Sequence, residues 1–126
     1  AYASRIGERP WQVYVRPFPA GPGEWLIGAG AAPVWSADGT ELFFADRGRL
    51  MQARVTTNGS FTASAPEPLF MNPRLTALFT FPNYGVSPDG KRFLTVEVEQ
   101  ELAQPVMRVV ENWLSEFRGT TQSRKN

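Results

Sequence analysis

The feature that most constrains this chain is a short turn-like motif that occurs twice. Residues 36–44 read SADGTELFF and residues 87–95 read SPDGKRFLT, so the same Ser-x-Asp-Gly corner stands before an aromatic strand pattern in both places. A turn-and-strand unit that recurs within one chain indicates a repeated structural module. We therefore expect at least two copies of one supersecondary unit.

Each corner has the residue types of a type I turn that is followed by a residue with positive φ. In the second copy, proline fixes φ at the second position, and the glycine tolerates the left-handed conformation that folds the chain back as a hairpin with a bulge. The first copy has alanine in place of the proline. The residues predicted to form these structural turns are Ser36, Asp38, Gly39, Ser87, Pro88, Asp89 and Gly90.

Almost all of the remaining chain has the pattern of strands and turns. Val13 and Val15 alternate with polar or amphipathic residues, which is the period of a half-buried strand, and residues 46–49 (DRGR) are typical of a tight hairpin. Residues 112–118 instead place three large apolar side chains on one helical face, so a short C-terminal helix is predicted there. The predicted strands span 11–18, 24–28, 33–36, 41–46, 49–56, 67–70, 83–87, 91–98 and 105–111.

Two stretches carry a resemblance to a known family. PVWSADGTELFF (33–44) and NYGVSPDGKRFLTV (83–96) resemble the WD40-like propeller repeats of TolB-type proteins, and the run from 11 to 118 is similar to the last blades of propellers attached to bacterial serine/threonine kinases. The resemblance implies an all-β fold of about two four-stranded antiparallel blades, partial at each end, with the short helix at the C-terminus. The implied organisation is a flexible lead (1–10), a partial blade (11–28), a complete blade (33–70), an apolar insertion (71–82), a partial last blade (83–111), the helix (112–118) and a disordered tail (119–126).

Composition excludes several kinds of chemistry. The 126 residues include no cysteine and no histidine, which removes thiolate zinc sites and histidine-based catalysis. The 13 basic and 12 acidic residues are nearly balanced, which argues against nucleic acid as a partner, and no apolar run is long enough for a membrane span. We predict no catalytic residue, no cofactor and no metal ligand, and the chain is expected not to be an enzyme.

Four patterns could indicate a ligand site, a catalytic group or a modification site, but we prefer a structural role for each. GAGAAP (28–33) begins like a dinucleotide loop but has proline where a third glycine is needed, so a linker is expected. Glu97, Glu99 and Glu101 share one strand face, where they could bind a cation or perform acid–base chemistry, although a solvated face is commoner. The aspartates of the two turns could be catalytic, but each is expected to cap its turn by hydrogen bonding. Asn58 matches the glycosylation pattern, but we interpret it as part of a loop turn.

The irregular stretch 70–83 (FMNPRLTALFTFPN) is unusually rich in large apolar side chains. Such side chains must be buried over their own blade or against a partner. We therefore predict a contact surface for a protein partner in this stretch and in the loop near residues 83–86 that follows it. Its members are Leu75, Leu78, Phe79, Phe81 and Tyr84.

These patterns lead to two functional hypotheses. The first is a non-catalytic propeller fragment that serves as a protein-binding or assembly scaffold, either by self-association, with three copies supplying six blades, or as part of a longer propeller. The second is a sensing or substrate-gating part of a larger enzyme, a kinase or a prolyl-oligopeptidase-type hydrolase, whose catalytic domain is absent here. The resemblance leans towards an extracytoplasmic bacterial location, and no ligand is indicated by the sequence.

Overall fold

The computed structural model describes residues 1–19, 21–75, 82–97 and 106–110, and in these ranges every regular element is a β-strand in an antiparallel pair. The predicted all-β class is confirmed. The first sheet has the order β1-β2-β3, with β1 at Tyr2–Ser4, β2 at Gln12–Val15 and β3 at Trp25–Ala29. The central sheet contains β4 (Ala31–Trp35), β5 (Glu41–Asp46), β6 (Arg49–Thr56) and β8 (Glu67–Met71), and the short β7 (Thr62–Ala63) also pairs with β6. The third sheet has the order β11-β10-β9, from β9 (Tyr84–Val86), β10 (Phe93–Glu97) and β11 (Val106–Val110).

The observed strands differ from the predicted ones in few places. The stretch 1–10, expected to be a flexible lead, contains β1, which pairs with β2 in the register Tyr2 to Tyr14. The strands β1 and β7 are three and two residues long, too short to show a period in the sequence. The predicted helix 112–118 and tail 119–126 lie outside the described residues, as does half of the insertion 71–82, at residues 76–81.

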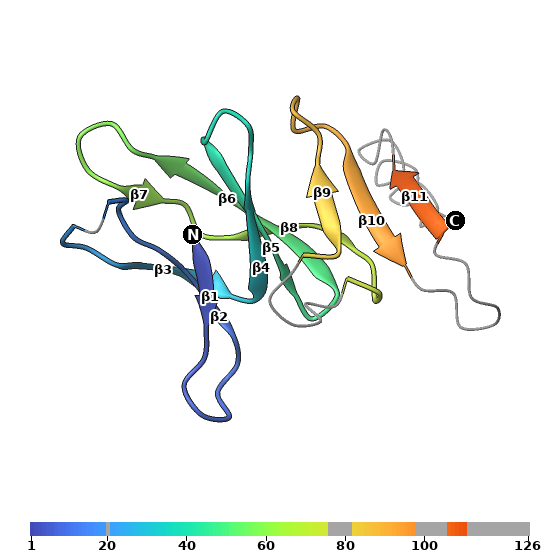
Figure 1. The fold of residues 1–126 in the computed structure, drawn as a ribbon, viewed down its shortest axis with the longest axis horizontal. Helices are drawn as coiled ribbons and strands as arrows, with labels where there is room; N and C mark the ends of the chain where they lie inside the picture. The colour runs from blue at the N-terminus through green and yellow to red at the C-terminus, as the bar shows by residue number, and fades with distance from the viewer. Residues whose placement is uncertain (20, 76–81, 98–105, 111–126) are drawn as a thin grey trace, which may run out of the picture.

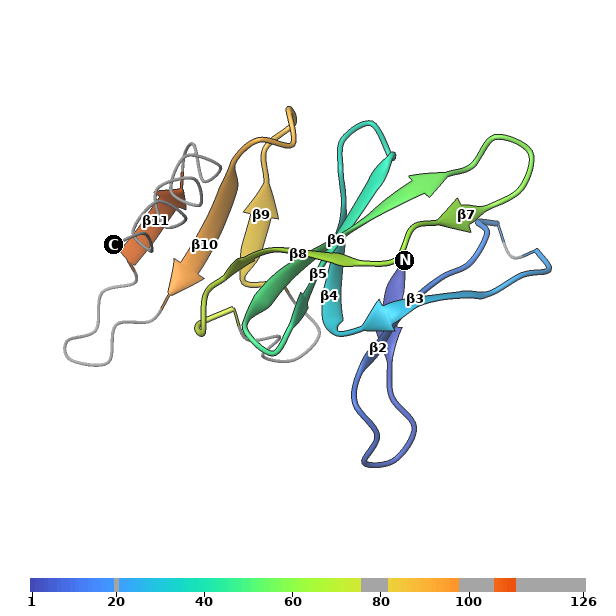
Figure 2. The same cartoon turned by 180° about the vertical axis from the view of Figure 1, so that it is seen from behind.

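The three sheets lie side by side, with the central sheet between the other two (Figures 1 and 2). Strand β5 shows the consequence most clearly, because Leu42 and Phe44 pack against the first sheet while Phe43 and Ala45 pack towards the third. All four side chains are buried. A strand that is covered on both faces is apolar at consecutive positions rather than at alternate ones, which explains the run LFFA.

Two hydrophobic clusters hold the sheets together. The first joins Val13, Val15 and Ile27 of the first sheet to the central sheet, with Trp25 and Trp35 packed at its edge. The second joins the central sheet to the third sheet. Its buried members are Ala32, Phe43, Ala45, Leu50, Leu75, Tyr84 and Phe93. Most of the large aromatic side chains in these clusters are thus used in packing between sheets.

The step from the first sheet to the central sheet passes through a single glycine. Gly30 lies between β3 and β4 with φ of 143°, and its N–H donates a hydrogen bond to the carbonyl oxygen of Trp11 (2.8 Å). A Cβ atom at this position would lie 2.6 Å from the carbonyl oxygen of Ala45. The predicted linker 28–33 is therefore reduced to one residue between two strands, and that residue needs glycine for both space and conformation.

We expect Gly30→Ala to lower the free energy of unfolding by about 2 kcal/mol or more, because the methyl group meets backbone and the φ angle is strained for alanine. Urea unfolding followed by tryptophan fluorescence measures the change. The matched control is Gly85→Ala, since a Cβ atom there has no described neighbour within 4 Å. Equal stabilities of the two variants would contradict the close approach at Gly30.

Candidate functional site

The two Ser-x-Asp-Gly corners form nearly identical turns at the same end of their sheets, joining β4 to β5 and β9 to β10 (Figure 1). In the first turn, the N–H of Gly39 donates to the carbonyl of Ser36 (3.0 Å), and Gly39 has φ of 71°. The Ser36 hydroxyl accepts a hydrogen bond from the N–H of Glu41 (2.9 Å) and donates one to Asp38 Oδ1 (2.6 Å). The carboxylate of Asp38 also accepts the N–H of Thr40 (3.1 Å).

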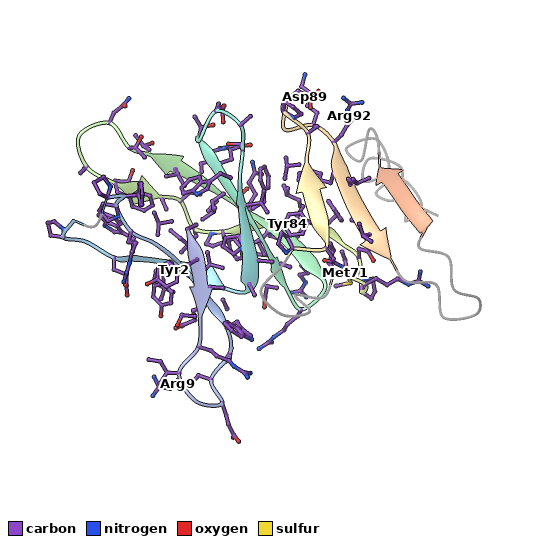
Figure 3. All side chains as sticks on the ribbon, in the orientation of Figure 1. Tyr2, Arg9, Met71, Tyr84, Asp89 and Arg92 are labelled. Atoms are coloured by element: carbon purple, nitrogen blue, oxygen red, sulfur yellow. The ribbon has the colours of Figure 1, made fainter. Side chains whose placement is uncertain are left out.

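The second turn repeats this network. Gly90 has φ of 68°, and its N–H donates to the carbonyl of Ser87 (2.9 Å). The Ser87 hydroxyl accepts the N–H of Arg92 (2.9 Å) and donates to Asp89, whose Oδ1 accepts the N–H of Lys91 (3.1 Å). Asp89 and Arg92 lie at the end of the third sheet that holds this turn (Figure 3). Both aspartates therefore accept hydrogen bonds from residues of their own turn, as the capping interpretation predicts.

Hydrogen bonding shifts the titration of both turn aspartates. The Ser36 hydroxyl, followed by the Thr40 N–H, lowers the pKa of Asp38, and the Ser87 hydroxyl, followed by the Lys91 N–H, lowers the pKa of Asp89. In both cases the hydrogen bonds favour the ionised carboxylate. The shifts therefore have a structural cause and do not identify a catalytic acid.

Two residues of the predicted contact surface are buried within the chain. Leu75 and Tyr84 belong to the cluster between the central and third sheets, where Figure 3 also shows Tyr84. The Tyr84 hydroxyl donates a hydrogen bond to the carbonyl oxygen of Ala32 (2.6 Å), and burial raises the pKa of this phenol. These two side chains join sheets of the same chain rather than forming an exposed surface. Leu78, Phe79 and Phe81 lie outside the described residues, as do Glu99, Glu101 and the side chain of Glu97.

The outer face of the first sheet is an ordered aromatic surface. The rings of Tyr2 and Tyr14 stack with centroids 5.6 Å apart, and Leu26, opposite Tyr14, is 56% exposed. Glu24 accepts hydrogen bonds from the hydroxyl of Tyr2 (2.6 Å) and from the guanidinium of Arg16 (3.0 Å), and these bonds lower the pKa of Glu24. We call Tyr2, Tyr14, Arg16, Glu24 and Leu26 the tyrosine face.

The outer face of the third sheet is aliphatic where its side chains are described. On β10, Phe93 and Thr95 are buried towards the central sheet, while Leu94 and Val96 alternate to the other side. Val96 is 44% exposed. Both flanking sheets therefore have one buried face and one face with accessible apolar side chains.

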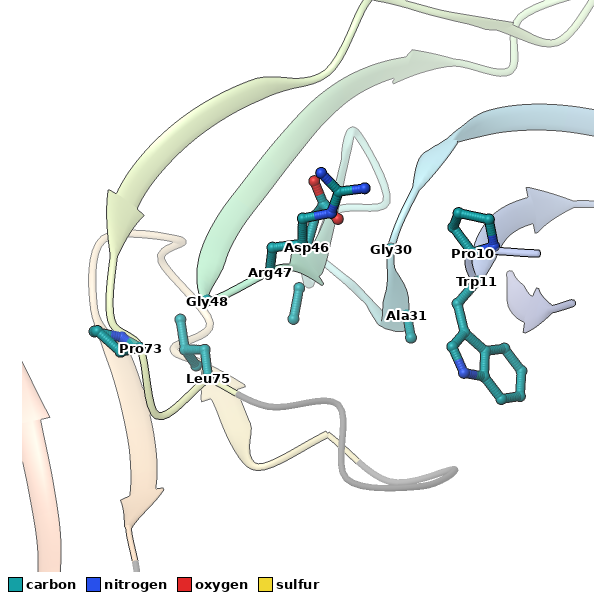
Figure 4. A pocket seen from close by; sticks show the side chains of 10 residues that line it. Pro10, Trp11, Gly30, Ala31, Asp46, Arg47, Gly48, Pro73 and Leu75 are labelled. Carbon is teal, nitrogen blue, oxygen red and sulfur yellow. The ribbon is translucent and has the colours of Figure 1, made fainter. Parts of the chain in front are cut away.

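A cavity of about 460 Å³ lies at the end of the sheets opposite the two turns (Figure 4). Pro10 and Trp11 form one wall, the β5–β6 hairpin with Asp46 and Arg47 forms another, and Pro73 with Leu75 forms a third. Trp11 is 39% exposed and also lines a smaller cavity of about 270 Å³ beside β1. The sequence predicted the hairpin but not this cavity, because its walls come from segments far apart in the chain.

Two features are absent from the described residues. They contain no group of three or more acidic, histidine or cysteine side chains that could hold a metal ion. In the same ranges, no helix has the length and hydropathy needed to cross a membrane.

The chain matches no protein-family model, no curated protein and no solved structure. The resemblance to TolB-type repeats accordingly stays a prediction.

Gly90→Val should lower the free energy of unfolding by more than ~1 kcal/mol, because a β-branched residue resists positive φ. The position is otherwise open, since a Cβ atom there would have only the Glu41 carboxylate nearby, at 3.8 Å. Thermal unfolding measures the change. Gly90→Asn is the control, because asparagine tolerates this conformation. Identical midpoints for the two variants would mean that the turn is not constrained by φ.

Folding stability should depend on the two turn aspartates only where they are ionised. Because their folded-state pKa values are lowered, their contribution is present above the unfolded-state value of about 4 and is lost as the pH falls through the folded-state values. The double variant Asp38→Asn with Asp89→Asn should be less stable than the native chain at pH 7, and the difference should shrink below about pH 4. Urea unfolding at several pH values measures it, with Glu8→Gln, a change in an exposed loop, as control. A difference that does not vary with pH would contradict this account.

Proposed function

We propose that this chain is a non-catalytic β-propeller segment that serves as a protein-binding or assembly scaffold. The observation that carries the proposal is the stack of three sheets, in which the central sheet is buried on both faces and each flanking sheet on one. Propeller blades pack face to face in this manner. In a propeller, such a stack continues around the ring until both outer faces are covered.

The strand order supports the interpretation of the sheets as blades. Strands β4, β5, β6 and β8 pair in this order as a four-stranded antiparallel sheet, which is the composition of one blade. The third sheet repeats the first two strands of the central sheet, since β9 and β10 are joined by the same turn as β4 and β5. The repeated corner of the sequence thus occupies equivalent places in two neighbouring sheets.

The partner that best fits the open faces is another sheet of the same kind. The tyrosine face combines tyrosine, arginine and an exposed leucine, residue types that contribute strongly to protein interfaces, and the outer face of β10 offers aliphatic side chains. Each chain supplies three sheets, and propellers contain about four to eight blades. If each sheet counts as one blade, two copies would supply six blades, whereas the two blades per chain predicted from the sequence would require three copies. A longer chain that carries further blades would cover the same faces.

Self-association is tested by light scattering after size exclusion across a range of concentrations. We expect a mass of about twice the 14.0 kDa of one chain. Leu26→Asp or Val96→Asp should each give a monomer, because either one places a charge in the apolar contact. Ile6→Asp, a change at an exposed apolar residue in the β1–β2 loop, should leave the mass unchanged.

Mixing the two monomeric variants sharpens the test. If the tyrosine face of one copy meets β10 of the next, a mixed pair keeps one intact contact and should re-associate, whereas either variant alone should not. A native chain that stays monomeric at every concentration would contradict self-association. The covering sheet would then have to come from the same polypeptide.

A further inference from the structure

Five arginines lie in or beside the segments that line the larger cavity, and Arg47 is itself a lining residue. We propose that this cavity binds an acidic peptide segment, with an apolar residue of the peptide against Trp11 and acidic residues facing the arginines. The site is separate from the outer sheet faces, so the proposal does not depend on how the sheets assemble.

The walls of the cavity are held in place by backbone hydrogen bonds. The N–H of Gly30 donates to the carbonyl of Trp11 (2.8 Å), which fixes the wall from the first sheet. On the opposite side, the N–H of Asn72 donates to the carbonyl of Gly48 (2.8 Å), and the N–H of Leu75 donates to the backbone carbonyl of Asn72 (2.8 Å). A cavity built this way is preformed, which lowers the entropic cost of binding. Its volume also falls within the range of about 300–1,000 Å³ that is usual for ligand pockets.

Arg47 occupies a backbone conformation that its side chain does not favour. It precedes Gly48 in the two-residue β5–β6 hairpin, and both residues have positive φ, 49° and 77°. Asparagine or glycine is the preferred residue at such a position. The guanidinium of Arg47 makes no hydrogen bond or ion pair with any described residue, and neither does the carboxylate of Asp46 beside it. The turn itself therefore gives no reason for arginine here, whereas a ligand at the cavity would.

The charges around the cavity are mostly positive. Exposed arginines stand at Arg5, whose guanidinium lies 5.1 Å from the Trp11 ring centre, and at Arg9, in the loop before Pro10 (Figure 3). Arg49 lies opposite Asp46 in the strand register at the base of the hairpin, and Arg74 lies between two lining residues in the sequence. The acidic residues in these segments are Glu8 and Asp46. Since the whole chain has a net charge of only +1, this end is much more basic than the average and should attract carboxylates.

The other side chains of the cavity favour a peptide over a polyphosphate chain. Pro10, Trp11 and Pro73 provide rigid apolar surface of the kind that holds an extended peptide. Asp46 lines the cavity between these walls (Figure 4). Its carboxylate can accept an N–H from a peptide backbone, a donor that a polyphosphate lacks.

The experiment uses three fluorescein-labelled probes and the full 126-residue chain. The first probe is a hexapeptide of two glutamates, leucine, proline and two glutamates. The second replaces every glutamate by lysine, and the third is a hexamer of thymidylate. Fluorescence anisotropy should show saturable binding of the acidic peptide that weakens when the ionic strength is raised to about 0.5 M, and no binding of the lysine peptide.

Arg47→Asn is the decisive variant because asparagine suits the turn. Thermal unfolding should occur at the same temperature or a higher one, while the affinity for the acidic peptide should fall by about tenfold, the loss expected for one charge-assisted hydrogen bond. The matched control is Arg54→Gln, which removes one positive charge from β6 where it pairs with Glu41, near the opposite end. The control should leave the affinity within about twofold, because distant exposed charges are screened.

Three results would overturn the proposal. The first is no saturable binding of the acidic peptide up to about 1 mM, the limit of weak specific association. The second is an equal loss of affinity in Arg47→Asn and Arg54→Gln, which would mean attraction to the net charge alone. The third is tighter binding of thymidylate than of the acidic peptide, which would assign the cavity to nucleic acid. Light scattering on the same samples reports assembly separately, so failure of peptide binding and failure of self-association are distinguishable.

Discussion

The burial of β5 on both faces is the constraint on which the rest of the structure depends. Phe43 and Phe44 are neighbours in sequence, yet each belongs to a different hydrophobic cluster. Two adjacent aromatic side chains of one strand can both be removed from water only if a further layer covers each face. The first and third sheets supply these layers, so their positions follow from the central strand. In this sense the stacking of the three sheets is specified by residues 42–45 of β5 rather than by the connections between sheets.

The parts of this fold that could be predicted from sequence are those decided within a few residues. The turns at Ser36 and Ser87 were readable because the hydroxyl, the carboxylate and the glycine that close each loop lie within four residues of one another. The cavity at Trp11 was not, because its walls meet only after three sheets have packed. Tyr84 illustrates the same limit, since its aromatic ring suggested a contact surface whereas its actual partner is the carbonyl of Ala32, far away in sequence.

The two ends of the stack differ in how well they obey local conformational preferences. At one end, glycine takes positive φ in both turns and the polar side chains are satisfied by hydrogen bonds. At the other, two non-glycine residues have positive φ, Ala32 at 55° and Arg47 at 49°, and each lines one of the two cavities beside Trp11. Strained backbone that survives in a folded chain is commonest at functional sites. The asymmetry therefore directs attention to the Trp11 end, independently of its charge.

Stacking and peptide binding would also reinforce each other energetically. Trp11 is tied to the first sheet, the hairpin at Arg47 belongs to the central sheet, and Leu75 packs in the cluster shared with the third. A ligand that contacts all three walls binds only when the sheets are stacked, so it must favour the stacked state over any in which they separate. By the same linkage, anything that covers the outer faces and stabilises the stack would increase the population of the intact cavity. A scaffold built of packed sheets would in this way couple its assembly to the occupancy of a binding site at one end, without a conformational switch.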